Sequence, residues 1–200
     1  MAVVGELAVV TGPPGAGKSA VAERLVALFD PSVLVAGDDF FAFLRTGAVP
    51  PWHETAHRQN AAVIDAAAAA TGRLAAHFDV VYDGVVGPWF LPAFLGSTGV
   101  SHLHYLVLLP PMPICLERVR NRRGHSFTDL EAAAHMWHEF DRSDLDPRHV
   151  LSAEGVEPAA LAQRLAERIG DGSLRHPGGT EARGPGTTGT FAEGLTDRRS

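Results

Sequence analysis

Residues 12–19 of this 200-residue chain read Gly-Pro-Pro-Gly-Ala-Gly-Lys-Ser, which matches the pattern G-x-x-x-x-G-K-[ST] at every fixed position. An apolar run at residues 7–11 precedes this stretch, and residues 18–29 follow it with apolar side chains at helical spacing. A strand, a glycine-rich turn and a helix in that order bring the backbone N–H groups of the turn to the positive end of the helix. The stretch therefore predicts a loop that holds phosphate groups.

Two side chains at the end of this loop suit nucleotide chemistry. Lys18 is the single lysine beside sixteen arginines, and its compact ammonium can reach the β- and γ-phosphates and act in catalysis. The hydroxyl of Ser19 can ligate Mg²⁺. We expect the nucleotide to contact the whole loop and the first helical turn, namely Gly12, Pro13, Pro14, Gly15, Ala16, Gly17, Lys18, Ser19 and Ala20.

Strand-like and helix-like segments alternate along the chain. We expect strands at residues 7–11, 33–36, 78–82, 102–109 and 149–152. We expect helices at residues 18–29, 40–45, 55–71, 114–123, 129–142 and 158–169. Gly72 is expected to end the long alanine-rich helix. Alternating strands and helices predict an α/β fold of three layers, with a parallel sheet covered by helices on both faces.

The composition changes after residue 170. Residues 1–170 have the pattern of one folded domain, whereas residues 171–200 contain seven glycines and show no apolar periodicity. Such a segment buries too little apolar surface to offset its ordering entropy. We therefore expect a disordered C-terminal tail over 171–200.

Composition also bears on the partners and the compartment. The formal net charge of -6 argues against binding nucleic acid through bulk positive charge. No apolar run is long enough for a membrane span, and the N-terminus lacks the basic region of a secretory signal. The single Cys115 forms neither an intramolecular disulfide nor a cysteine zinc site. We expect a cytoplasmic protein, and the sequence leaves its oligomeric state open.

Carboxylates follow two of the predicted strands. The carboxyl ends of parallel strands open on the ligand crevice, so Asp38 is expected to face the γ-phosphate and accept a proton from an acceptor hydroxyl. The alternative is a helix cap, a role that we assign to Asp39. Asp83 ends the strand at 78–82 and is expected to hold Mg²⁺ or to anchor the acceptor, although Asp-Gly is also an ordinary turn signal.

Arginines gather in the helix predicted at 114–123. Arg118 and Arg122 are four residues apart, so both would face one ligand from one side of a helix, where they can stack on adenine and grip phosphate oxygens. Arg120 and Arg123 fit a solvated basic face equally well. Residues 124–128 interrupt the helices and are expected to form a small lid.

These features in this order resemble the P-loop small-molecule kinases, the relatives of shikimate, gluconate and adenylate kinases. Among them the chain is most similar to chloramphenicol phosphotransferase-like proteins and AAA-type ATP-binding kinases, over residues 5–169. The resemblance implies a five-stranded parallel sheet in the order 2-3-1-4-5 and transfer of phosphate from ATP-Mg²⁺ to a hydroxyl. It also implies that Asp38 activates the acceptor and that Arg118 and Arg122 lie on the adenine and lid sides.

Residues 53–57 read His-Glu-Thr-Ala-His, the H-E-x-x-H pattern of zinc hydrolases. The pattern starts directly after Pro50, Pro51 and Trp52, at the start of a helix, and no third-ligand pattern follows. We instead expect this region to form the acceptor pocket, with the aromatic wall coming from the segment after the third strand; core packing is an equal alternative for its tryptophan. The residues predicted to bind the acceptor are Asp38, Trp52, Arg58, Asp83 and Trp89.

The sequence as a whole predicts an ATP-dependent phosphotransferase acting on a small hydroxylated molecule. Two alternatives remain: a nucleotide-binding regulatory module with little turnover, and a toxin-like kinase of a nucleotide-sugar. The acceptor itself is left open, since an antibiotic, a sugar or a nucleoside would each suit the pattern.

Overall fold

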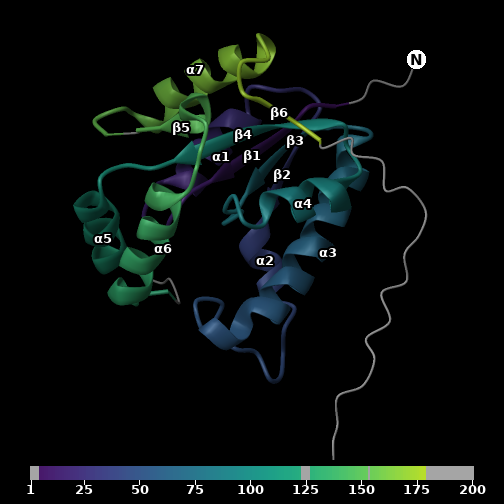
Figure 1. Ribbon diagram of the computed structural model, residues 1–200. Helices are drawn as coiled ribbons and strands as arrows, with labels where there is room; N and C mark the ends of the chain where they lie inside the picture. Colours follow the sequence, from purple (N-terminus) through teal and green to yellow (C-terminus); the bar gives the residue numbers. More distant parts are fainter. Residues whose placement is uncertain (1–4, 123–126, 153, 179–200) are drawn as a thin grey trace, which may run out of the picture.

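The computed structural model describes residues 5–122, 127–152 and 154–178 (Figure 1). The strands are β1 (Leu7–Thr11), β2 (Ser32–Ala36), β3 (Asp79–Asp83), β4 (His102–Leu108), β5 (Val150–Leu151) and β6 (Arg175–Pro177). The α-helices are α1 (Lys18–Val26), α2 (Gly37–Phe41), α3 (His57–Ala75), α4 (Leu91–Thr98), α5 (Met112–Asn121), α6 (Leu130–Arg142) and α7 (Pro158–Gly170). Two short 3-10 turns, η1 (Glu54–Ala56) and η2 (Pro147–His149), precede α3 and β5.

The five predicted strands are parallel and lie in the order β2-β3-β1-β4-β5, which confirms the expected sheet. A sixth strand, β6, adds to this sheet by pairing antiparallel with the start of β4. It lies along the same edge of β4 as β5, which pairs only with the end of that strand.

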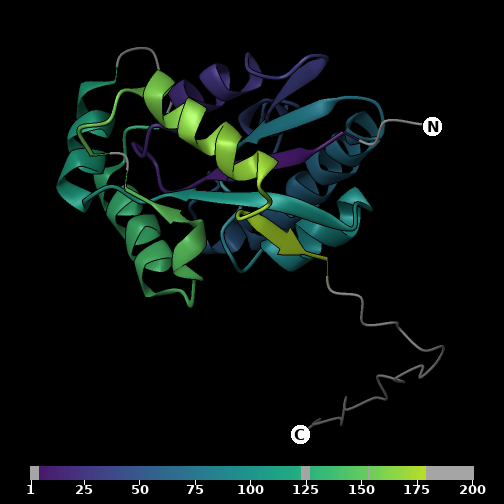
Figure 2. The same cartoon turned by 90° about the horizontal axis from the view of Figure 1, so that it is seen from above.

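The sheet has a core on each face because neighbouring residues of each strand point to opposite sides. In β1, Leu7 and Val9 pack toward α3 and α4, whereas Ala8 and Val10 pack toward α1 and α7. The two helical layers therefore lie on opposite sides of the sheet, as the two views show (Figures 1 and 2). This is the predicted three-layer fold, and it fixes the carboxyl ends of the strands at one edge.

Several helix boundaries differ from the predictions by two to four residues, and those of α3 and α2 bear on packing and on the site. Helix α3 continues past Gly72 to Ala75, and a Cβ at Gly72 would lie 2.7 Å from Thr98 Cα and closer still to the Thr98 carbonyl oxygen. Gly72 is therefore a point of close contact between α3 and α4 rather than a helix stop. Helix α2 begins directly at Gly37, three residues earlier than expected, and ends at Phe41.

The predicted tail also begins too early. Leu174 is fully buried in the core beside α7, and its carbonyl oxygen accepts a hydrogen bond from the Tyr105 N–H at 3.1 Å. Residues 175–177 then form β6. Residues 171–178 thus belong to the folded domain, because one leucine and an open strand edge suffice to hold them. The remainder of the predicted tail, 179–200, lies outside the described residues.

None of the helices that the structure describes is long and apolar enough to cross a membrane.

Candidate active site

The glycine-rich loop between β1 and α1 has a backbone that only glycine adopts easily. Gly15 has φ of 79°, and a Cβ there would lie 2.9 Å from Cys115 Cα and closer still to the Cys115 carbonyl oxygen. Gly12 has φ of 142° and lies against the carbonyl of Leu108 in the same way. The loop is therefore pressed between the end of β4 and the start of α5, with its N–H groups at the beginning of α1.

Lys18 opens α1 and folds back over this loop. Its Nζ donates a hydrogen bond to the carbonyl oxygen of Pro13 at 3.1 Å. Burial lowers the pKa of Lys18, while the carboxylates of Asp83 and Asp38 act to raise it. The ammonium thus lies against the loop and near two carboxylates, where it can meet the negative charge of a phosphate chain.

Asp83 reaches the same place from the adjacent strand. It ends β3 and is in register with Val10 of β1 and Ala36 of β2, directly before the loop and α2. Its Oδ1 is buried and has no hydrogen-bond partner among the residues that the structure describes. Burial raises the pKa of Asp83, and the Ser19 hydroxyl and the Lys18 ammonium act in the opposite direction. A buried free carboxylate oxygen beside a serine hydroxyl suits Mg²⁺, which prefers hard oxygen ligands.

Asp38 and Asp39 both lie in the first turn of α2, exposed, at the carboxyl end of β2. The residue that precedes the helix is Ala36, and no side chain of the described residues caps it. The predicted capping role of Asp39 is therefore wrong, because the helix starts too early for either carboxylate to be its cap. The charge of Asp38 acts on the pKa of both Lys18 and Tyr82, so its carboxylate lies near these two side chains.

Sequence reasoning missed Tyr82, which precedes Asp83 in β3. A Cβ at Gly37 would lie 2.8 Å from Tyr82 Cζ, so the ring packs directly against the start of α2. Burial raises the pKa of the Tyr82 phenol, with Asp38 and Asp83 adding to the shift. A neutral hydroxyl is thereby held between the two carboxylate-bearing segments. The glycine at position 37 was the only signal of this close approach in the sequence.

The two predicted site arginines differ in local structure, because Arg118 lies within α5 and Arg122 lies just after it. Arg118 on α5 donates from Nη1 to the carbonyl oxygens of Gly15 at 3.2 Å and Ala16 at 3.3 Å, and so braces the loop. Arg122 follows the end of α5 in an extended conformation, so the predicted pairing of both arginines on one helix face is wrong. Its charge nevertheless acts on the pKa of Lys18 and Asp83, so its guanidinium lies near these two side chains.

Comparison with known proteins identifies this arrangement. The model of the family described as "AAA domain" matches residues 7–143, from β1 through α6. The chain belongs to this AAA-domain family. The P-loop kinase resemblance predicted from the sequence is thus confirmed. No curated protein matches the chain.

Solved structures share the fold of this AAA domain. The tunicamycin resistance protein of Deinococcus radiodurans superposes with a TM-score of 0.61 at 18% identity, over 83% of this chain and 96% of that one. Shikimate kinase from Acinetobacter baumannii gives 0.58 at 17% identity, over 86% and 97%. A gluconokinase from Sinorhizobium meliloti gives 0.51 at 20% identity, over 86% and 99%. At these identities the likeness shows the fold.

The segment between β2 and β3 of the AAA domain carries two of the predicted acceptor residues. Trp52 packs edge-on against Phe127 with ring centroids 4.8 Å apart. Phe127 lies in the predicted lid, of which residues 124–126 are outside the described part. Arg58 is exposed in the first turn of α3. The structure thus brings Trp52 to the lid segment, while Arg58 remains a prediction.

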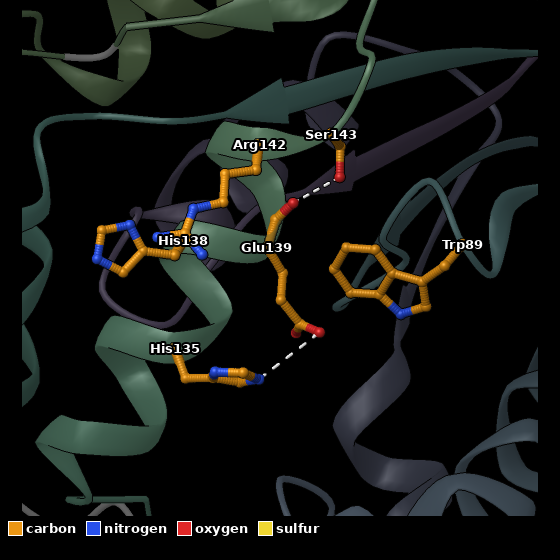
Figure 3. Close-up of a pocket in the computed structure, with 6 residues that line it drawn as sticks. All are labelled: Trp89, His135, His138, Glu139, Arg142 and Ser143. Carbon is orange, nitrogen blue, oxygen red and sulfur yellow. Dashed lines mark hydrogen bonds and ion pairs between the residues drawn. The ribbon is translucent and has the colours of Figure 1, made fainter.

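Trp89 lies in a pocket between the segment after β3 and helix α6. The pocket has a volume of about 330 Å³ and is lined by Trp89, His135, His138, Glu139, Arg142 and Ser143. Figure 3 shows the indole of Trp89 facing Glu139, whose carboxylate pairs with His135 at 3.7 Å. The ring also packs on Phe140 with centroids 5.3 Å apart, so Trp89 combines core packing with an exposed edge. The predicted contact of Trp89 with the acceptor stays a prediction.

The H-E-x-x-H pattern forms no zinc site in the described residues. His53 precedes the short turn η1, whereas His57 begins α3 and stacks on Phe90 with centroids 5.6 Å apart. The two histidines belong to no group of three potential ligands among the side chains that the structure describes. The spacing fails because η1 and α3 are separate turns rather than one helix.

Proposed function

We propose that this AAA domain is an ATP-dependent phosphotransferase that moves the γ-phosphate of ATP to a hydroxyl of a small molecule. The observation that carries the proposal is the meeting of Lys18, Asp83 and Asp38 at the loop, each from a different strand–helix junction. A structural role alone does not account for a half-buried lysine near two carboxylates, one of which has a buried oxygen with no hydrogen-bond partner among the described residues.

The loop and Lys18 would bind the phosphate chain. The N–H groups at the start of α1 face the phosphates, and Lys18 would exchange its hydrogen bond with Pro13 for contacts with the β- and γ-phosphate oxygens. Arg118 holds the loop in shape through Gly15 and Ala16. Arg118 would also contact the adenine.

Ser19 and Asp83 would hold Mg²⁺, which when bound neutralises charge on the phosphates. The Oδ1 of Asp83 is the free oxygen that such a role requires. Arg122 would add a second positive charge on the lid side, where charge develops during transfer.

Asp38 would receive the proton of the acceptor hydroxyl. It is exposed at the start of α2, next to the site and open to a ligand, as a general base must be. The acceptor would lie between Asp38 and the aromatic residues that the sequence predicts, Trp52 and Trp89. A partly exposed indole gives an apolar face on which a sugar-like or aromatic acceptor can stack.

The neighbouring carboxylates Asp38 and Asp39 provide a matched test. Both are exposed in the same helical turn and neither caps it, so replacing either with asparagine changes one charge at nearly one place. Asp38→Asn should lower acceptor-dependent transfer by roughly 10²- to 10⁴-fold with ATP affinity nearly unchanged. Asp39→Asn should transfer at close to the wild-type rate.

Transfer is measured as ADP release with a panel of hydroxylated metabolites, and ATP affinity by calorimetry. Equal activity in the two variants would remove Asp38 from the mechanism. Nucleotide binding without acceptor-stimulated ADP release would instead favour a regulatory nucleotide-binding module.

A further inference from the structure

A second group of reactive side chains lies at the end of the sheet opposite the phosphate loop. Glu6 directly precedes β1, whereas the loop follows the other end of that strand, about 16 Å away at the usual rise for five residues. His102 and His104 are the first and third residues of β4, so their side chains lie on the same face of the sheet. This group takes no part in the proposed phosphotransfer.

The three side chains converge on a single oxygen. The Oε2 atom of Glu6 lies 2.9 Å from His104 Nε2 and 3.3 Å from His102 Nε2. One ligand atom from each residue lies within 4.8 Å of the other two. A tetrahedral zinc ion with bonds of about 2.1 Å separates its ligands by roughly 3.4 Å, so only small side-chain movements are needed to admit the ion.

The surroundings hold these side chains in place. Arg175 of β6 donates to the other carboxylate oxygen, Oε1, at 3.2 Å and leaves Oε2 to the histidines. Ser101 Oγ lies 3.1 Å from His102 Nδ1 and can orient that ring. His104 is fully buried, so packing holds its ring in place.

We propose that Glu6, His102 and His104 form a binding site for a zinc-class divalent cation, with a fourth position open to water. Two imidazole nitrogens and one carboxylate oxygen are the donor set that zinc and its first-row neighbours prefer, whereas Mg²⁺ prefers oxygen alone. His102 and Glu6 are partly exposed, which gives the ion a path to the site. The cation would tie the start of β1 to β4 beside the β6 edge.

Cobalt titration of the full chain, without a histidine tag, tests the site. We expect one equivalent of Co²⁺ to give the intense visible absorption of four-coordinate cobalt, with Zn²⁺ displacing it and excess Mg-ADP leaving it unchanged. Glu6→Gln and His102→Ala should each weaken binding by at least about tenfold. His102 is the safer position because its side chain is partly exposed, and circular dichroism verifies that both variants fold.

His135→Ala is the control variant. It removes a different histidine that also pairs with a glutamate, Glu139, but on an exposed helix surface. The control should bind cobalt as the wild type does. The proposal fails if the wild type shows no cobalt band, if both site variants keep wild-type affinity, or if the control loses as much affinity as they do. Any of these outcomes would mean that Glu6, His102 and His104 only hydrogen-bond to one another.

Discussion

Replacing Gly72 with alanine should destabilise the protein, although the same change stabilises most helices. In an ordinary helix interior, Gly→Ala contributes about 1 kcal/mol through helix propensity. At Gly72, however, the new Cβ would lie 2.7 Å from Thr98 Cα, whereas carbon atoms in contact prefer about 3.5–4.0 Å. Helices α3 and α4 would have to separate by about 1 Å, and overpacking of this kind costs roughly 1–3 kcal/mol.

The closer overlap with the Thr98 carbonyl oxygen puts the cost at the upper end, so we expect a net loss of about 1–2 kcal/mol. For a domain of this size, the loss lowers the melting temperature by roughly 2–8 °C. Gly96→Ala in α4 is the matched control, because a Cβ there would meet no atom of the described residues within 4 Å. That variant should melt a few degrees higher. Thermal denaturation of the two variants tests this prediction. A melting temperature that rises as much for Gly72→Ala as for Gly96→Ala would refute the close contact.

Three further predictions concern the C-terminal segment, the loop and pH. Leu174→Ala should lower the free energy of unfolding, measured in urea, by about 2–5 kcal/mol because the side chain is fully buried. A loss below about 1 kcal/mol would show that residues 171–178 are not part of the folded domain. Lys18→Ala should abolish transfer and weaken ATP binding, yet unfold no more easily than the wild type, because it removes a half-buried charge. Burial, and then Arg148, lower the pKa of His149, so the unfolded chain binds the extra proton as the pH falls below about 6.5. The free energy of unfolding should therefore decrease as the pH is lowered from about 7.5 to about 5.5. His149→Asn should make this decrease smaller, and an unchanged dependence on pH would exclude His149 as a cause.

The parts of the fold that the sequence predicted are those set by local pattern. The strand before residues 12–19, the helix after it and the carboxylate at the end of β3 follow from apolar runs and glycine positions, and all three lie where expected. The parallel order of the strands came from the resemblance to kinases. Periodicity alone does not distinguish one strand order from another.

The features that were missed depend on contacts between distant segments. Nothing local marks Leu174 as a core residue, because its burial comes from α7 and from pairing of β6 with β4. Gly72 reads as a stop signal until α4 lies against it. Arg122 has helical spacing from Arg118, but α5 ends one residue before it. Each error comes from reading a tertiary constraint as a local one.

Transfer of a labelled γ-phosphate tests the central proposal most directly. The chain is incubated with ATP carrying ¹⁸O in its γ-phosphate and a pool of small hydroxylated molecules, and mass spectrometry follows both ADP and the pool. The proposed function predicts ADP in equal amount to one phosphorylated product that carries the label, with neither formed by Lys18→Ala. ATP that binds to the wild-type loop but leaves no label on any hydroxyl, with the same ADP release whether or not the pool is present, would contradict it.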